Sequence, residues 1–204
     1  MNELKELSEE AVHICWITAF AMKSGVHLML PTLKKAHERG AEIQLLVGDY
    51  LSITQPEALR ILLDNLPKAE IRLYQTYGRS FHPKAYLFRH EGSQHVIVGS
   101  SNLSRSALTT GIEWSLHTIE LPTFEQSMEE FNRVFYAENT ISVNNISVAD
   151  YEKRYKEASR VMALSDKWSE AEEASLMYGT ESQASVVKEQ KTEVTVLQPR
   201  PAQK

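Results

Sequence analysis

The stretch SFHPKAYLFRHEGSQHVIVGSSN, residues 80–102, decides the fold that this sequence predicts. Ser80–Phe88 and Gln94–Val98 are rich in aromatic and β-branched residues, which favours two strands. Between them His90-Glu91-Gly92-Ser93 has the composition of a hairpin turn,. Such a hairpin returns the chain after the second strand to the start of the first, so Asn102 is expected near His82.

The spacing of His82 and Lys84 adds chemistry to this hairpin. Side chains alternate along a strand, so both are expected on one face. The other face would carry Phe81, Ala85 and Leu87. An imidazole beside an ammonium can act as a nucleophile or an acid on a phosphate whose oxygens the ammonium holds.

The segments around the hairpin alternate between strand and helix patterns, which predicts an α/β fold with a mostly parallel central sheet flanked by helices. Pro31 suits the first turn of a helix, so the first of these helices is expected to start near Leu30 and to end at Gly40. The expected strands are 12–20, 42–48, 69–74 and 112–119, and the expected helices are 25–39, 55–66 and 123–135.

The chain is expected to divide into three parts. Residues 1–138 would form the domain that carries the site, followed by a loop at Asn139–Asn145. Residues 139–178 would be a charged helical appendage, packed loosely or on another domain. Residues 179–204 are polar and contain few large apolar side chains, which is typical of a linker.

Charge is distributed unevenly along the 204 residues. The chain has 27 acidic and 22 basic side chains, which argues against a general nucleic-acid coat or a polybasic membrane anchor,. Residues 68–110, however, contain six basic and two acidic residues. The sequence therefore predicts positive charge beside the site, with Arg79 and Arg105 as candidates for substrate binding, although Lys68 and Arg72 suit an ordinary solvated surface equally well.

The single cysteine, Cys15, excludes an internal disulfide and fits a reducing cytoplasm,. The N-terminus has no signal-peptide pattern, and no apolar run reaches the length of a bilayer. The seven histidines show no zinc-site spacing, so we expect neither a structural metal nor another cofactor,.

Two further groups complete the candidate site. Gly99-Ser100-Ser101-Asn102 taken alone suits a turn before a short helix with Asn102 as its N-cap,. Beside a His-x-Lys pair, the same asparagine can hold a phosphate oxygen, and the carboxylate of Glu113 can orient an imidazole. The candidate catalytic residues are therefore His82, Lys84, Asn102 and Glu113, with Ser100, Arg79 and Arg105 as candidates for substrate binding.

His-x-Lys followed by Gly-Ser-x-Asn and a later acidic residue resembles the signature of the phospholipase D superfamily. The resemblance implies that His82 attacks phosphorus to form a covalent phosphohistidine. It also implies that Lys84 and Asn102 bind the non-bridging oxygens and that Glu113 hydrogen-bonds the imidazole, without a metal.

One position departs from that signature. The superfamily has an aspartate five residues after the lysine, where this chain has Arg89. The interval from Lys84 to Asn102 is also longer than usual, which a longer hairpin turn can absorb. With Asn102 and Glu113 kept, the pattern is more similar to the nuclease branch, including restriction endonucleases of this type, than to the lipid-cleaving branch.

The C-terminal residues Leu197–Lys204 resemble the approach to the first motif of superfamily 2 helicases, although Pro-Arg-Pro also suits a disordered tail. Domains similar to residues 1–140 occur at the N-terminus of such helicases in bacteria. This implies a truncated chain, or a short reading frame, related to a helicase. No phosphate-binding glycine-rich loop with lysine is present, so the chain is not expected to be an ATPase.

The proposed chemistry needs a second histidine to protonate the leaving oxygen. No other histidine has a lysine two residues later, so the sequence predicts a homodimer with two copies of His82 across one groove,. Phe81 and Trp114 suit core packing better than this interface. The predicted function is a metal-independent DNA endonuclease, and the alternative, motivated by Arg89, is an inactive DNA-docking module of a helicase or a defence system.

Overall fold

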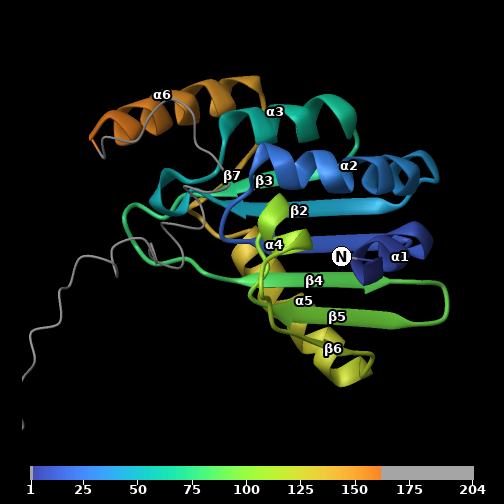
Figure 1. The fold of residues 1–204 in the computed structure, drawn as a ribbon. Helices are drawn as coiled ribbons and strands as arrows, with labels where there is room; N and C mark the ends of the chain where they lie inside the picture. Colours follow the sequence, from blue (N-terminus) through green and yellow to red (C-terminus); the bar gives the residue numbers. More distant parts are fainter. Residues whose placement is uncertain (1, 162–204) are drawn as a thin grey trace, which may run out of the picture.

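The computed structural model describes residues 2–161, which fold around one seven-stranded sheet with the strand order β6-β5-β4-β1-β2-β3-β7 (Figure 1). The strands are β1 His13–Thr18, β2 Glu42–Gly48, β3 Glu70–Tyr74, β4 Lys84–Arg89, β5 Gln94–Gly99, β6 Ser115–Thr118 and β7 Thr140–Ser142.

The expected α/β architecture is confirmed, but the sheet is mixed rather than mostly parallel. Only β1, β2 and β3 run parallel. Strands β4, β5 and β6 follow each other antiparallel, and β7 pairs antiparallel with β3. Between β4 and β5 the reason is connection length, because the turn at 90–93 leaves no room for the helical crossover that a parallel pair needs,.

Helices cover both faces of the sheet. The helices are α1 Asn2–Glu10, α2 Lys23–Glu38, α3 Pro56–Asn65, α4 Arg105–Thr109, α5 Leu121–Phe135 and α6 Asn145–Val161, and a single 3-10 turn, η1, covers Tyr50–Ser52. Figure 1 shows α2, α3 and α6 on one side of the sheet and α5 on the other.

Strand β1 shows how the sequence builds both layers of the core. Ile14 and Trp16 pack into the cluster beneath α2 and α3, whereas Cys15 and Ile17 pack against α5. Because both faces are covered, the strand is an almost unbroken apolar run.

Helix α2 begins at Lys23, seven residues before the expected start at Leu30, and Pro31 lies inside it. A proline in a helix interior costs about 3 kcal/mol through its missing N–H and its ring. Here the Pro31 ring is exposed, while Val26, Met29 and Leu33 are fully buried on the opposite side. Burial of that apolar face offsets the cost.

The C-terminal part of the described chain also differs from the prediction. The expected loop at 139–145 contains β7, which extends the sheet beyond β3. Helix α6 is not a loose appendage, because Val148 and Tyr151 are buried in the core beneath it and the Tyr151 hydroxyl donates to Thr54 O at 2.7 Å. Residues 139–161 therefore belong to the same packed unit as the sheet.

The rest of the expected appendage, the linker and the helicase-like segment at 197–204 lie outside the described residues. None of the helices within residues 2–161 has the length and apolar character needed to cross a membrane.

Candidate active site

The hairpin of β4 and β5 brings the predicted catalytic residues to one edge of the sheet. Ala85 pairs with Val98, so continuing the antiparallel register places His82 opposite Ser101, next to Asn102. The carboxyl ends of β1, β2 and β3 meet the same edge, because β4 runs antiparallel to β1 and begins where β1 ends. In α/β sheets this is the edge where ligands bind.

His82 and Lys84 lie together, although β4 begins at Lys84 instead of Ser80. Lys84 Nζ is 3.4 Å from His82 Nδ1 and donates to His82 O at 3.0 Å. The expected alternation of faces is confirmed, since Phe81, Ala85 and Leu87 all pack on the α5 side. The His82 side chain is exposed, and Lys84 is 9% exposed.

The pKa values of both His82 and Lys84 are lowered. Burial, and then the Lys84 ammonium, lower the pKa of His82, which favours the neutral and nucleophilic imidazole at neutral pH,. Burial lowers the pKa of Lys84, and the carboxylate of Glu113 opposes that change. Glu113 therefore acts electrostatically on Lys84.

Asn102 is held in a buried loop with its side chain unused by the fold. The residue is 3% exposed, and its Oδ1 has no hydrogen-bond partner among the described residues. Ser104, rather than Asn102, caps α4 by accepting from Ala107 N. The donor of this carboxamide is its Nδ2, which is the atom that could hold a phosphate oxygen, because Oδ1 and a phosphate oxygen are both acceptors.

Backbone contacts fix the loop that carries Asn102. Tyr86 donates from its hydroxyl to Ser101 O at 2.8 Å, and Met22 N donates to Leu103 O at 2.9 Å. Helix α2 approaches this loop so closely that a Cβ on Gly25 would lie 2.2 Å from Leu103 O. Asn102 can therefore keep its position only if residue 25 is a glycine, which has no Cβ,.

Glu113 is joined to the Gly-Ser-Ser-Asn loop through Ser100. The Ser100 hydroxyl donates to Glu113 Oε2 and accepts from Trp114 N at 3.0 Å. Glu113 also lines a cavity of about 280 Å³ with Tyr86 and Ser101. The structure thus places Glu113 beside Ser100 and within electrostatic range of Lys84, while its role in orienting an imidazole stays a prediction.

Only part of the basic segment 68–110 lies at the edge that carries the site. Arg79 is exposed in the segment after β3, and Arg105 opens α4, both at the edge that carries the site. Lys68 precedes β3 and therefore lies toward the opposite edge. Arg72 is paired with Glu70. The linear cluster reduces to Arg79, Lys84 and Arg105.

Arg89, the departure from the expected signature, is remote from the site. It ends β4, five residues and therefore about 17 Å from Lys84 along the strand,. Its guanidinium lies 5.1 Å from the centroid of the Phe124 ring. The position where the superfamily has an aspartate therefore lies away from His82 and Lys84.

Three tyrosines near the site were not predicted as part of it. Tyr50 lies edge-on to the His82 ring at a centroid distance of 4.4 Å. Phe81 stacks on Tyr74 at 4.1 Å, in space that a Cβ on Gly48 would occupy. Tyr86 anchors Ser101, as described above. Tyr50 and Gly48 come from segments far away in sequence, so only the assembled sheet reveals them.

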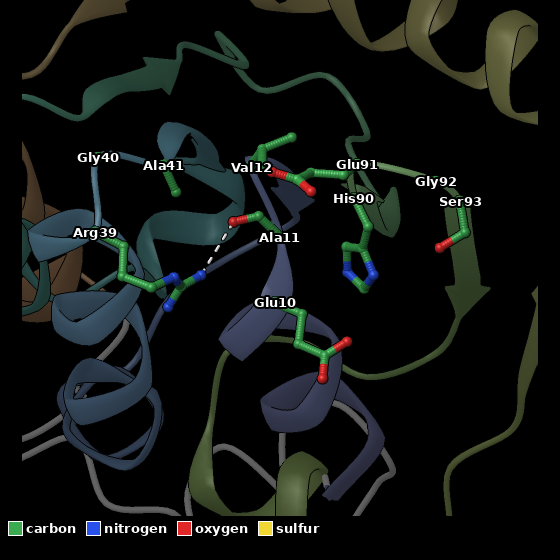
Figure 2. A pocket seen from close by; sticks show the side chains of 10 residues that line it. All are labelled: Glu10, Ala11, Val12, Arg39, Gly40, Ala41, His90, Glu91, Gly92 and Ser93. Atoms are coloured by element: carbon green, nitrogen blue, oxygen red, sulfur yellow. Dashed lines mark hydrogen bonds between the residues drawn. The ribbon is translucent and has the colours of Figure 1, made fainter.

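A larger hollow, of about 640 Å³, lies elsewhere. Figure 2 shows it between the end of α1, the end of α2 and the β4–β5 turn, with the Arg39 guanidinium donating to Ala11 O at 3.1 Å. Glu10 and Glu91 line it, and the hollow holds none of the predicted catalytic residues. Within residues 2–161, no group of three or more His, Cys, Asp or Glu side chains is arranged to hold a metal ion.

The sheet edge brings together a paired histidine and lysine, a buried asparagine and a glutamate bound to a serine, which are groups that can bind and attack a phosphate,. Comparison with known proteins agrees with that class. Residues 4–135 match the family model described as cardiolipin synthase, PLD-like domain. The match spans more than half of the chain, and the protein therefore belongs to the phospholipase D-like family.

Solved structures support the fold. NucT from Helicobacter pylori is 16% identical with a TM-score of 0.56, and the match covers 70% of this chain and 89% of NucT. Nuc from Salmonella typhimurium, a phospholipase D family member, is 14% identical with a TM-score of 0.56, covering 71% and 90%. Polyphosphate kinase from Porphyromonas gingivalis is 12% identical with a TM-score of 0.50, covering 78% and 26%. No curated protein matches the chain significantly.

Proposed function

We propose that this chain is a phosphodiesterase that cleaves nucleic acid, DNA foremost, through a phosphohistidine intermediate and without a metal. The observation that carries the proposal is the pairing of an exposed imidazole of lowered pKa with a buried lysine, next to the buried carboxamide of Asn102. These are a nucleophile and two phosphate-binding groups at one sheet edge.

In this mechanism the imidazole of His82 attacks phosphorus, so that a P–N bond forms and the P–O bond to the leaving group breaks. The Lys84 ammonium and the Asn102 carboxamide hold the two non-bridging oxygens as negative charge develops on them. A second imidazole gives its proton to the leaving oxygen. It then takes a proton from water, which attacks phosphorus and releases His82.

A second copy of the chain supplies that second imidazole. An apolar surface suited to this contact lies beside the site on β5, on β6 and on the segment just before β6. It is formed by Val98, Ile112, Trp114 and Leu116, which are 50%, 101%, 88% and 70% exposed. We call it the β5–β6 apolar surface. The expectation that Trp114 packs in the core is wrong, whereas Phe81 is buried as expected. Exposed apolar surface of this kind favours a protein contact.

The choice of nucleic acid over lipid rests on the sequence pattern. With Asn102 and Glu113 kept, that pattern is more similar to the nuclease branch of the superfamily than to the lipid-cleaving branch. A helicase partner and a role in restriction remain proposals that rest on the sequence alone. The alternative of an inactive docking module was motivated by Arg89. That residue lies about 17 Å along β4 from Lys84, so it gives no reason to expect inactivity,.

The test is incubation of the purified chain with labelled DNA, labelled RNA and bis-p-nitrophenyl phosphate in excess EDTA. We expect cleavage by the wild type and its loss in His82→Ala and Lys84→Ala, with Arg39→Ala, a change at the opposite edge of the sheet, retaining activity. A wild type that leaves all three substrates intact would refute the proposal.

A further inference from the structure

A small cavity lies next to the nucleophile, beyond the ends of β2 and β3. It has a volume of about 250 Å³ and is lined by the segments 49–52 and 76–79 and by Arg154 of α6. Tyr50 lines this cavity and also lies against the His82 ring at 4.4 Å. One tyrosine ring therefore connects the cavity to the reacting imidazole.

Asp49 is the structural support of this cavity. Its carboxylate is buried, and Oδ1 accepts from Thr76 N at 2.8 Å and from Thr76 Oγ1 at 2.7 Å. Oδ2 accepts from Arg154 Nη1 at 2.9 Å. Both oxygens are occupied and the charge is compensated, so Asp49 joins three segments without repelling an anion.

The backbone of both walls is held in an unfavourable conformation. Leu51, Ser52 and Tyr77 have φ angles of 51°, 54° and 48°, although none is a glycine. Residues in this region cluster at ligand clamps and active sites, where the surrounding structure imposes them. In one wall the result is a tyrosine, Tyr77, that is 72% exposed at the cavity.

The groups that line the cavity match the parts of one nucleotide. Tyr50 and Tyr77 offer aromatic rings, on which a base can stack,. Arg79 offers a guanidinium to which none of the described residues is hydrogen bonded,. The larger hollow in Figure 2 has neither a tyrosine nor a tryptophan in its lining and has Glu10 and Glu91 at its rim, so it lacks this combination.

The volume sets the size of the ligand. Pockets for drug-sized molecules measure about 300–1,000 Å³, so this cavity accommodates one base rather than a longer segment,. A base in a duplex is paired and stacked, and it enters such a cavity only after leaving the stack at an energetic cost. An unpaired strand has no such cost.

We propose that this cavity binds one unpaired nucleotide beside the scissile phosphodiester, with its base on Tyr77 and Tyr50 and its phosphate at Arg79. The site then favours single-stranded over double-stranded nucleic acid. This inference rests on the proposed function, since it names the substrate class of the same site.

The test compares binding of a fluorescein-labelled single-stranded oligonucleotide and its duplex at one fixed salt concentration. The protein carries His82→Ala so that no cleavage occurs. We expect the single strand to bind more tightly, and Tyr77→Gly, which suits the positive φ, to weaken its binding about tenfold without changing duplex binding,. Tyr136→Ala, an exposed tyrosine that contacts Glu70 at the start of β3, is the control and should alter neither.

Equal effects of Tyr77→Gly on both nucleic acids, or no effect on either, would overturn the inference. Hydrolysis of bis-p-nitrophenyl phosphate by proteins with His82 intact separates this result from the chemistry. If the Tyr77→Gly enzyme hydrolyses that substrate but keeps the wild-type ratio of single-strand to duplex cleavage, the nucleotide cavity is refuted and the catalytic proposal stands. If the wild type hydrolyses nothing, the catalytic proposal fails, and the binding comparison still decides the cavity.

Discussion

Gly25→Ala is the substitution for which the structure predicts an effect opposite to the one expected from the sequence. Gly25 lies in the first turn of α2, and replacing a helical glycine with alanine favours the helix by up to about 1 kcal/mol,. The new Cβ, however, would lie 2.2 Å from Leu103 O, 2.3 Å from Leu103 C and 2.4 Å from Ser104 N. All three are backbone atoms, so no side-chain rotation relieves the contact.

The magnitude follows from the size of the overlap. Cβ contacts below 3.0 Å are essentially never seen, so the loop or the helix must move by about 1 Å,. Overpacking of this kind costs about 1–3 kcal/mol of folding free energy. The same movement displaces Asn102, the residue before Leu103, and a misplacement of about 1 Å in a reactive geometry can lower a rate by about 100-fold.

The assay pairs urea denaturation with phosphodiester cleavage. Gly25→Ala is expected to be less stable by about 1–3 kcal/mol and at least tenfold slower. Gly92→Ala is the matched control, because a Cβ there would have no atom within 4 Å, and it should retain stability and rate. A Gly25→Ala protein as stable and as active as the wild type would refute the argument that this close approach positions Asn102.

Three further changes test other parts of the account. Arg89→Asp restores the usual aspartate and should change kcat/KM in cleavage kinetics less than about threefold. In urea titration, the loss of the contact with Phe124 should lower the free energy of unfolding by about 0.5–1 kcal/mol,. A large gain of activity would contradict the conclusion that Arg89 is remote from the site. An NMR titration should find the pKa of His82 in the wild type below the usual histidine value near 6.5,. In Lys84→Met the pKa of His82 should be higher than in the wild type, because the ammonium disfavours a second positive charge,. An unchanged pKa in the variant would refute this coupling. Trp114→Lys should convert the dimer to a monomer in sedimentation and lower cleavage at least tenfold, because the second imidazole is lost,. Ile146→Lys, which changes an exposed apolar residue on α6, should do neither. A wild type that is already monomeric yet active would exclude the dimer.

The sequence predicted the hairpin well because its signals are local. Alternation along Lys84–Arg89 and the turn at 90–93 set the register, and the register alone brings Asn102 to His82. The strand over 42–48 and the helix over 56–65 were also found, since unbroken apolar runs and a proline in the first turn are strong markers,.

The failures depend on contacts made only in three dimensions. Pro31 misled the prediction of α2, because the burial of Val26 and Met29 outweighs a local penalty. Strand β7 has three residues and is stabilised by pairing with β3, which no local pattern reports. Trp114 looked like a core residue, yet it lies just before the edge strand β6 and is 88% exposed.

The cavity proposed to bind a nucleotide was missed for a related reason. Tyr50, Tyr77 and Arg154 are each unremarkable in sequence and meet only through the carboxylate of Asp49 and the ends of β2 and β3. The positive φ angles at Leu51 and Tyr77 were equally hidden, because neither residue is a glycine or an asparagine.

The central claim is that the imidazole of His82 becomes bonded to phosphorus during turnover. The most direct measurement is mass spectrometry of the protein quenched at alkaline pH during cleavage of an oligonucleotide in EDTA. The account predicts a nucleotide phosphate attached to the peptide that carries His82, and its absence in His82→Ala. Cleavage that proceeds at the same rate in His82→Ala, or that stops when EDTA is added, would contradict the account.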